Sequence, residues 1–186
     1  MSSYKSVQAL AARVAGEFGP GKKKLDIAIL NAGVLTTEFT VNEQTGWDQM
    51  VQVNYLSTVL LAMLLMPAMR SGGVGEPGRL SIVGSGTALA APFKGRDKRP
   101  FLGGFDEKSF EVMGRYSDSK LLGHLWMVKL MEVLPEGLEN EVVVNIVDPG
   151  YCKGSGLHRD AKGVMGRLIE LSKVLTARSL DVYVGP

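Results

Sequence analysis

Short aliphatic runs alternate with longer stretches of helical periodicity along this chain. The short runs lie at Leu25 to Leu30, Arg79 to Gly84 and Val142 to Val147, and turn-forming residues bound each one, as is typical of buried strands. The longer stretches lie at about 4–18, 47–70, 116–134 and 163–175. Alternating helices and continuous aliphatic strands predict a parallel sheet with right-handed crossovers, covered by helices on both faces.

Capping and helix-breaking residues set the expected boundaries. Ser3 is placed to cap the first helix, and Pro67 followed by Ser71-Gly72-Gly73 marks the end of the second. The segment 73–78 has the spacing G-x-G-x-x-G, but it follows a helix, precedes a strand and contains a proline. A dinucleotide-binding turn needs the opposite order, so we reject it as a phosphate site. Residues 88–113 form a long irregular connection, either a substrate lid or a surface excursion, and we favour the excursion.

Composition describes a soluble domain. The 186 residues are 45% hydrophobic and 22% charged, which is enough apolar content for one globular core, so 1–186 is expected to be a single domain. A net charge of +2 does not favour nucleic acid or an anionic membrane as a partner. The N-terminus lacks a secretory signal, and the longest apolar run, Val59 to Met66, is too short to span a bilayer. We therefore expect a cytoplasmic protein.

Tyr116 and Lys120 are the first candidates for chemistry. Residues four apart share a helix face, so the phenol and the ammonium are expected to be neighbours. A nearby positive charge favours phenolate and lowers the pKa of a tyrosine, which makes Tyr116 a candidate acid or base. By itself the pair is more simply explained as an exposed tyrosine and lysine.

Other polar residues lie where ligands bind in parallel sheets, beyond the carboxyl ends of the strands. They are Asn31, Ser85 and the turn at Pro149. Each also has a structural interpretation, because asparagine, serine and proline are ordinary turn residues. Cys152, the single cysteine, excludes an internal disulfide and is more simply a small hydrophobic residue than a nucleophile. The two histidines have no metal-ligand spacing, so no metal site is expected.

Together these residues resemble the short-chain dehydrogenase/reductase family, and in particular fungal metabolite-tailoring reductases. The matching motifs, in family order, are Asn31-Ala32-Gly33, Val53-Asn54, Ser85, Tyr116-x-x-x-Lys120 and Pro149-Gly150. The resemblance implies a Rossmann-like, doubly wound parallel sheet containing strands 4–6 of the family pattern. The family's glycine-rich cofactor turn has no counterpart in the chain, and Gly154 stands about where the family places a threonine. We therefore expect an incomplete, N-terminally truncated Rossmann-like domain.

The resemblance also implies a role for each matching residue. Tyr116 would exchange a proton with the substrate oxygen, Ser85 would hold that oxygen, and Lys120 would lower the pKa of Tyr116 and bind the nicotinamide ribose. Asn54 would brace the backbone and support a proton relay. The residues expected to contact the cofactor are Asn31, Ala32, Gly33, Tyr116, Lys120, Pro149, Gly150 and Cys152.

The leading functional hypothesis is therefore an oxidoreductase that interconverts ketones and alcohols on a small molecule of secondary metabolism, with NADP or alternatively NAD as cofactor. A second hypothesis is a non-redox isomerase, dehydratase or cyclase that uses the Tyr116–Lys120 pair for proton transfer alone. A third is a non-catalytic binding or dimerisation protein. The resemblance also implies a homodimer through the helices at 47–70 and 116–134.

Overall fold

The computed structural model describes residues 1–70 and 75–150, which form three parallel strands and four α-helices. In chain order these are α1 (Tyr4–Glu17), β1 (Ile27–Leu30), α2 (Gln49–Val51), α3 (Thr58–Met69), β2 (Gly78–Val83), α4 (Val112–Val133) and β3 (Val142–Val147). A π-helical segment, Gln52–Ser57, joins α2 to α3. The helix expected near 163–175 lies outside the described residues.

The sheet confirms the predicted parallel pairing of three strands, while the described helices cover one of its faces rather than both. Its order is β1-β2-β3, and both pairings are parallel, with Leu30 opposite Ile82 and Ile82 opposite Ile146. Because consecutive strands are neighbours, the polar residues that follow them emerge at one end of the sheet. β1 is an edge strand of the described sheet.

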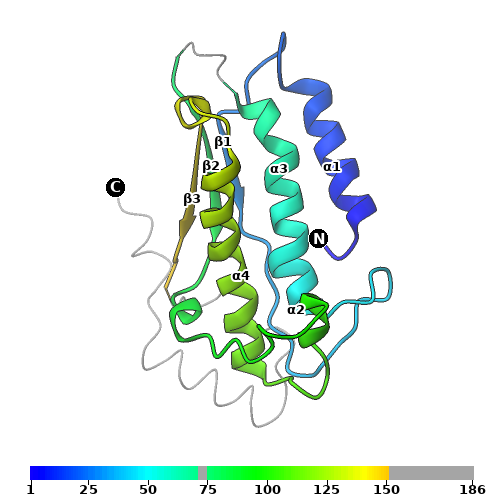
Figure 1. Cartoon of the computed structure of the whole chain (residues 1–186). Coiled ribbons are helices and arrows are strands. Elements are labelled where there is room, and N and C mark those ends of the chain that lie inside the picture. The colour runs from blue at the N-terminus through cyan, green and yellow to red at the C-terminus, as the bar shows by residue number, and fades with distance from the viewer. Residues whose placement is uncertain (71–74, 151–186) are drawn as a thin grey trace.

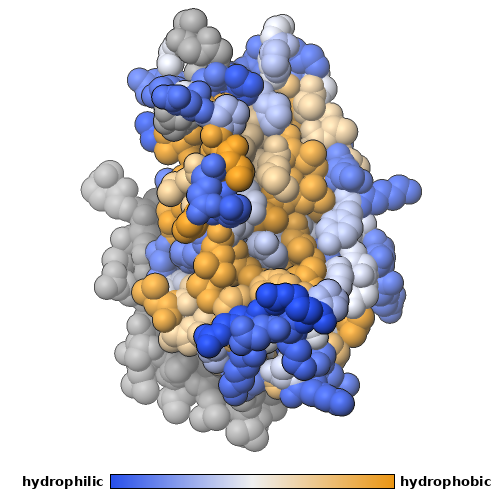
Figure 2. Space-filling model, in the orientation of Figure 1, coloured by the Kyte–Doolittle hydropathy of each residue, from blue (hydrophilic) through white to orange (hydrophobic). Residues whose placement is uncertain are grey.

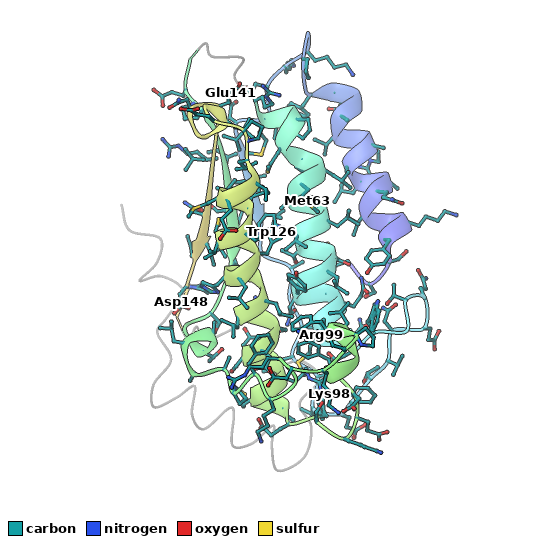
Figure 3. The ribbon with its side chains drawn as sticks, in the orientation of Figure 1. Met63, Lys98, Arg99, Trp126, Glu141 and Asp148 are labelled. Atoms are coloured by element: carbon teal, nitrogen blue, oxygen red, sulfur yellow. The ribbon has the colours of Figure 1, made fainter. Side chains whose placement is uncertain are left out.

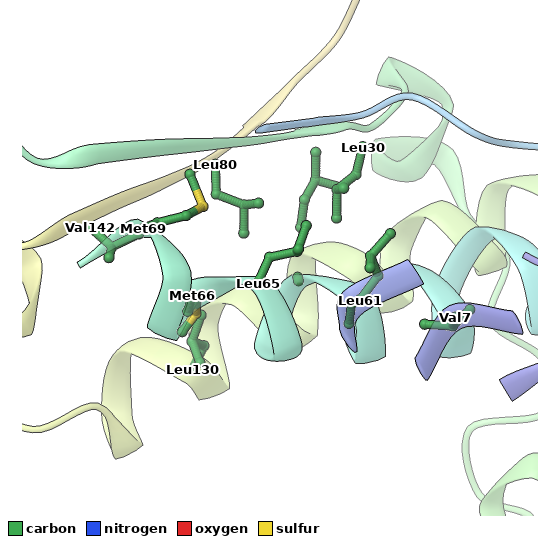
Figure 4. Packing of buried hydrophobic residues seen from close by; sticks show 12 residues of the cluster. Val7, Leu30, Leu61, Leu65, Met66, Met69, Leu80, Leu130 and Val142 are labelled. Carbon is green, nitrogen blue, oxygen red and sulfur yellow. The ribbon is translucent and has the colours of Figure 1, made fainter. Parts of the chain in front are cut away.

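The three long helices lie side by side along one face of the sheet (Figure 1). Alternate strand residues, among them Leu30 and Leu80, point toward them, and α3 supplies Leu61, Leu65 and Met69 to the same core (Figure 4). This packing places α3 and α4 over the sheet and fixes where their polar residues lie. On the opposite face of β1, Ile27 and Ile29 are 62% and 65% exposed in the part that the structure describes.

Two helix boundaries agree with the sequence expectations and one differs. Ser3 caps α1 as predicted, by accepting a hydrogen bond from the Ser6 amide. α3 ends at Met69, close to the expected end at residue 70, and Pro67 is tolerated in its last turn because a proline there removes only one backbone donor. α4 begins at Val112, four residues earlier than expected, because the Glu111 carboxylate accepts hydrogen bonds from the Met113 and Gly114 amides.

The helical stretch Gln49–Met69 is long and apolar enough to cross a membrane by length and composition. However, two thirds of its apolar window is buried inside the protein. In the described chain it is therefore the central core helix, which explains its hydrophobicity without a membrane.

The connection between β2 and α4 is packed against the helices. Three of its four phenylalanines, Phe93, Phe101 and Phe105, contact one another, two of the three pairs edge to face. Arg115 of α4 donates hydrogen bonds to the Phe105 and Asp106 carbonyls, and the Asp118 carboxylate accepts one from the Phe93 amide. These contacts hold the connection against α4.

Candidate active site

The carboxyl end of the sheet carries the chemically interesting residues. Asn31 follows β1, Ser85 follows β2 and Asp148 follows β3, and Figure 3 shows Asp148 at that end of β3. α4 passes the same end of the sheet with Tyr116, Ser119 and Lys120 on buried positions.

Asn54 joins the turn after β1 to α4. Its side-chain oxygen accepts a hydrogen bond from the Val34 amide (2.8 Å), and its amide nitrogen donates to the Val34 carbonyl (2.9 Å). The same nitrogen donates to the Ser119 hydroxyl at 3.0 Å. Asn54 lies within the π-helical segment, and such segments occur often at functional sites because they redirect a side chain within a helix. These contacts hold the backbone at Val34 against α4.

Lys120 is buried, with only 8% of its surface exposed, and its amine donates a hydrogen bond to the Val83 carbonyl at the end of β2 (2.8 Å). Burial disfavours the charged form and lowers the pKa of Lys120 to about 8. A methyl group added to Gly33 would lie 3.6 Å from the Lys120 amine and 3.4 Å from the Asn54 oxygen. Gly33 therefore brings backbone close to both groups.

The Ser85 side chain lies close enough to the Tyr116 phenol to lower its pKa. The hydrogen bonds of the Ser85 hydroxyl are with the Thr87 hydroxyl (3.0 Å) and the Thr87 amide (3.3 Å). The predicted lowering of the Tyr116 pKa by Lys120 is wrong. Burial raises the pKa of Tyr116 above its ordinary value, the nearby Ser85 side chain opposes the rise, and the Asp148 carboxylate adds to it. The Lys120 amine lies 5.8 Å from the centre of the Tyr116 ring. The removal of the Tyr116 phenol from water is the largest effect on its pKa and sets the direction of the shift.

Asp148 is a site residue that the sequence analysis did not single out. A methyl group on Gly86, the residue after Ser85, would lie 2.7 Å from the Asp148 carboxylate. The other carboxylate oxygen accepts a hydrogen bond from the Gly150 amide at 2.9 Å. Its position directly before Pro149 at the end of a strand was the available signal.

The remaining predicted cofactor contacts are at the same end of the sheet. Asn31 and Ala32 are exposed at the end of β1, and Pro149 and Gly150 are exposed after β3. Gly150 has a positive φ of 67°, which glycine adopts without strain. Cys152 lies outside the described residues. The buried Lys120 amine beside Gly33, with no side chain between them, fits a polar ligand with several hydroxyl groups at this edge.

Comparison with known protein families identifies one match. The model of the short chain dehydrogenase family matches residues 1–94. Among curated proteins, the short chain dehydrogenase/reductase mfmJ of Annulohypoxylon moriforme is 42% identical over 96% of this chain and 51% of its own length. The short-chain dehydrogenase fogG of Aspergillus ruber is 35% identical over 98% of this chain and 51% of its own length. The chain thus spans about half the length of these curated relatives.

Solved structures share the fold. A 3-alpha-hydroxysteroid dehydrogenase from Pseudomonas sp. B-0831, complexed with NADH, superposes with a TM-score of 0.60 at 22% identity, covering 91% of this chain and 65% of that one. A putative NAD(P)-dependent gluconate 5-dehydrogenase from Beutenbergia cavernae, with bound NADP, gives 0.60 at 18% identity over 100% and 64% of the two chains. At these identities the similarity establishes the Rossmann-like architecture.

Proposed function

Because the chain belongs to the short-chain dehydrogenase/reductase family, we propose that it interconverts a ketone and a secondary alcohol on a small molecule with a nicotinamide cofactor. The observation that carries the proposal is the meeting of the Ser85 hydroxyl with the Tyr116 phenol, on the helix that also bears the buried Lys120 amine. A hydroxyl and a phenol that lie close together can hold one substrate oxygen between them.

In the direction of reduction, Ser85 orients the carbonyl oxygen and Tyr116 donates a proton to it. The raised pKa of Tyr116 keeps the phenol protonated at neutral pH, which suits a proton donor. The cofactor, when bound, supplies the hydride that reaches the carbonyl carbon. Lys120, with a pKa of about 8, is largely protonated at neutral pH and contributes positive charge near the oxygen that gains electron density.

The residues available to hold the nicotinamide end of the cofactor are those around Gly33. Lys120 would hydrogen-bond the ribose hydroxyls, Asn31 to Gly33 would pack against the ring system, and Pro149 with Gly150 would cover one side. We propose NADP as the cofactor, with NAD as the alternative; the two structural neighbours described above were solved with NADP and with NADH.

A homodimer through α3 and α4 is part of the proposal. The outer surfaces of these helices carry apolar side chains in contact with solvent: Met63, Leu64, Leu125, Val128, Met131 and Val133. Figure 2 shows hydrophobic residues gathered over these two helices, and Figure 3 shows Met63 on α3. A contiguous apolar face of this kind marks a protein interface. Sedimentation of the wild-type chain and a Val128→Glu variant tests it: a dimer that the variant converts to monomer supports the interface, and a monomeric wild type refutes it.

The natural substrate is proposed to be a carbonyl or alcohol intermediate of fungal secondary metabolism, processed in the cytoplasm. The relatives of highest identity described above come from fungi and carry the dehydrogenase/reductase description.

The experiment is a fluorescence titration of NADPH and of NADH against the full chain, followed by a screen of ketones monitored by loss of NADPH absorbance. Saturable binding and ketone-dependent oxidation are expected, and Tyr116→Phe is expected to retain the binding and lose the oxidation. If neither nucleotide binds, redox chemistry is ruled out. Conversion of a substrate without nucleotide, lost in Tyr116→Phe, would instead establish the non-redox proton-transfer function.

A further inference from the structure

We propose that Ser119 is a positioning residue of this site, whose hydroxyl fixes the orientation of the Asn54 amide and, through it, the turn after β1. Ser119 lies between Tyr116 and Lys120 in the sequence, and its hydroxyl contacts the Asn54 amide and the Tyr116 carbonyl. The effect on cofactor binding rests on the proposed function, whereas the positioning itself does not.

The hydroxyl of Ser119 donates one hydrogen bond and accepts another, and the two roles are fixed. Its side chain is fully buried, and its hydroxyl donates its single proton to the Tyr116 carbonyl at 2.7 Å. The hydroxyl oxygen therefore has only lone pairs left to offer, and it meets the Asn54 amide nitrogen at 3.0 Å. Ser119 can accept from an amide nitrogen but cannot donate to an amide oxygen. This selects one of the two orientations of the nearly symmetrical Asn54 side chain.

The selected orientation is the one that the turn after β1 requires. With nitrogen toward Ser119, the Asn54 oxygen faces the Val34 amide and accepts its proton at 2.8 Å, while the second amide proton goes to the Val34 carbonyl at 2.9 Å. Both backbone groups of Val34 are thus held by one side chain. Gly33, directly before Val34, lies beside the Asn54 oxygen and the Lys120 amine. Loss of the Ser119 acceptor would loosen the contact between this turn and Lys120.

A packing role alone predicts something different. A helix serine that bonds only the carbonyl three residues earlier is satisfied within its own helix, and removing its hydroxyl leaves no other group without a partner. At Ser119 the removal leaves a buried Asn54 proton with one acceptor fewer. Ser117, two residues earlier on α4, is also buried and is not hydrogen-bonded to Asn54 among the described contacts, which makes it the matched control.

The test is amide hydrogen exchange measured by NMR on the isotope-labelled full chain. In Ser119→Ala, exchange of the Val34 amide is expected to accelerate at least tenfold relative to the Ile82 amide in β2, and the Asn54 side-chain amide signals are expected to shift. Ser117→Ala is expected to leave both unchanged. Ser119→Cys, which keeps a weaker acceptor, is expected to give an intermediate rate at Val34, and it carries the test if the alanine variant does not fold.

Equal Val34 exchange in Ser119→Ala and Ser117→Ala would overturn the proposal, as would wild-type exchange in Ser119→Cys when the alanine variant is unfolded. NADPH titration of the same samples separates the two proposals. Ser119→Ala is expected to weaken NADPH binding several-fold, while Ser117→Ala keeps wild-type affinity. A wild-type chain that binds neither NADPH nor NADH refutes the proposed function but leaves the exchange result to decide the role of Ser119.

Discussion

The buried ion pair between Arg115 and Asp48 makes the sharpest prediction about stability. The two side chains are 2% and 1% exposed, and their charged atoms lie 2.7 Å apart. Arg115 also donates hydrogen bonds to the carbonyls of Phe105 and Asp106 and to the Ser109 hydroxyl. Since Arg115 directly precedes Tyr116, the pair anchors the turn of α4 that carries the phenol.

Arg115→Met removes the partner of a buried carboxylate and is expected to lower the free energy of unfolding by about 3–5 kcal/mol. Asp48→Asn instead leaves the buried Arg115 guanidinium without its carboxylate partner. The new asparagine side-chain oxygen can still accept the hydrogen bond from the Val51 amide that the Asp48 carboxylate accepts as the N-cap of α2. The double variant leaves neither charge buried alone. The double variant is therefore expected to lose less free energy of unfolding than the two single variants lose together, by about 2 kcal/mol or more.

Urea unfolding followed by circular dichroism measures all four proteins. The exposed pair Lys129–Glu132, whose side chains are 71% and 56% exposed, supplies the control, and Lys129→Met is expected to leave the unfolding midpoint unchanged. Strictly additive costs for Arg115→Met and Asp48→Asn, or a cost for Arg115→Met no larger than that of the control, would contradict the argument.

Three further predictions concern single residues. The pKa of Lys120 is about 8 in the folded protein, against 10.5 for a lysine in the unfolded chain, so burying the ammonium costs roughly 3 kcal/mol at pH 7. Lys120→Met is therefore expected to raise the free energy of unfolding at pH 7 by roughly 1–3 kcal/mol. The unfolded chain binds the extra proton between pH 8 and 10.5, so wild-type stability gains from this group as pH rises through that window; an advantage of the variant undiminished at pH 10.5 would count against the assignment. Gly33→Ala makes only van der Waals contacts with Asn54 and Lys120, and it is expected to keep the wild-type unfolding midpoint but to weaken NADPH binding about tenfold by titration; a lowered midpoint would refute this. A methyl group on Gly78 would lie 2.5 Å from the Met69 carbonyl oxygen, so Gly78→Ala is expected to lower the unfolding free energy by about 1–3 kcal/mol in urea, and an unchanged midpoint would contradict that packing.

Sequence reasoning predicted the parallel sheet because its strands are short aliphatic runs separated by helical periodicity. The bounds of β3 matched the expected residues, 142–147. The site residues Asn54, Ser85, Tyr116 and Lys120 were found through spacing and resemblance. Their convergence follows from topology, since the carboxyl ends of neighbouring parallel strands lie at one edge.

Other features depend on tertiary contacts that spacing does not encode. Asp48 and Arg115 are 67 residues apart, so their pairing could not be inferred from either segment alone. The direction of the Tyr116 pKa shift depends on how much water the fold excludes, and the helical spacing to Lys120 gave the wrong sign. The start of α4 was missed because its cap is a glutamate, Glu111, which is not among the preferred N-cap residues.

The central claim is that the Tyr116 phenol exchanges a proton with a substrate oxygen that Ser85 holds beside it. A single-turnover measurement of NADPH oxidation tests this most directly, with wild type, Tyr116→Phe and Ser85→Ala compared at saturating nucleotide and with a ketone identified by the screen. The expected result is a rate lowered by a factor of about 10² to 10⁴ in Tyr116→Phe, a smaller loss in Ser85→Ala, and unchanged NADPH affinity in both. Oxidation by Tyr116→Phe at the wild-type rate would show that the proton comes from elsewhere.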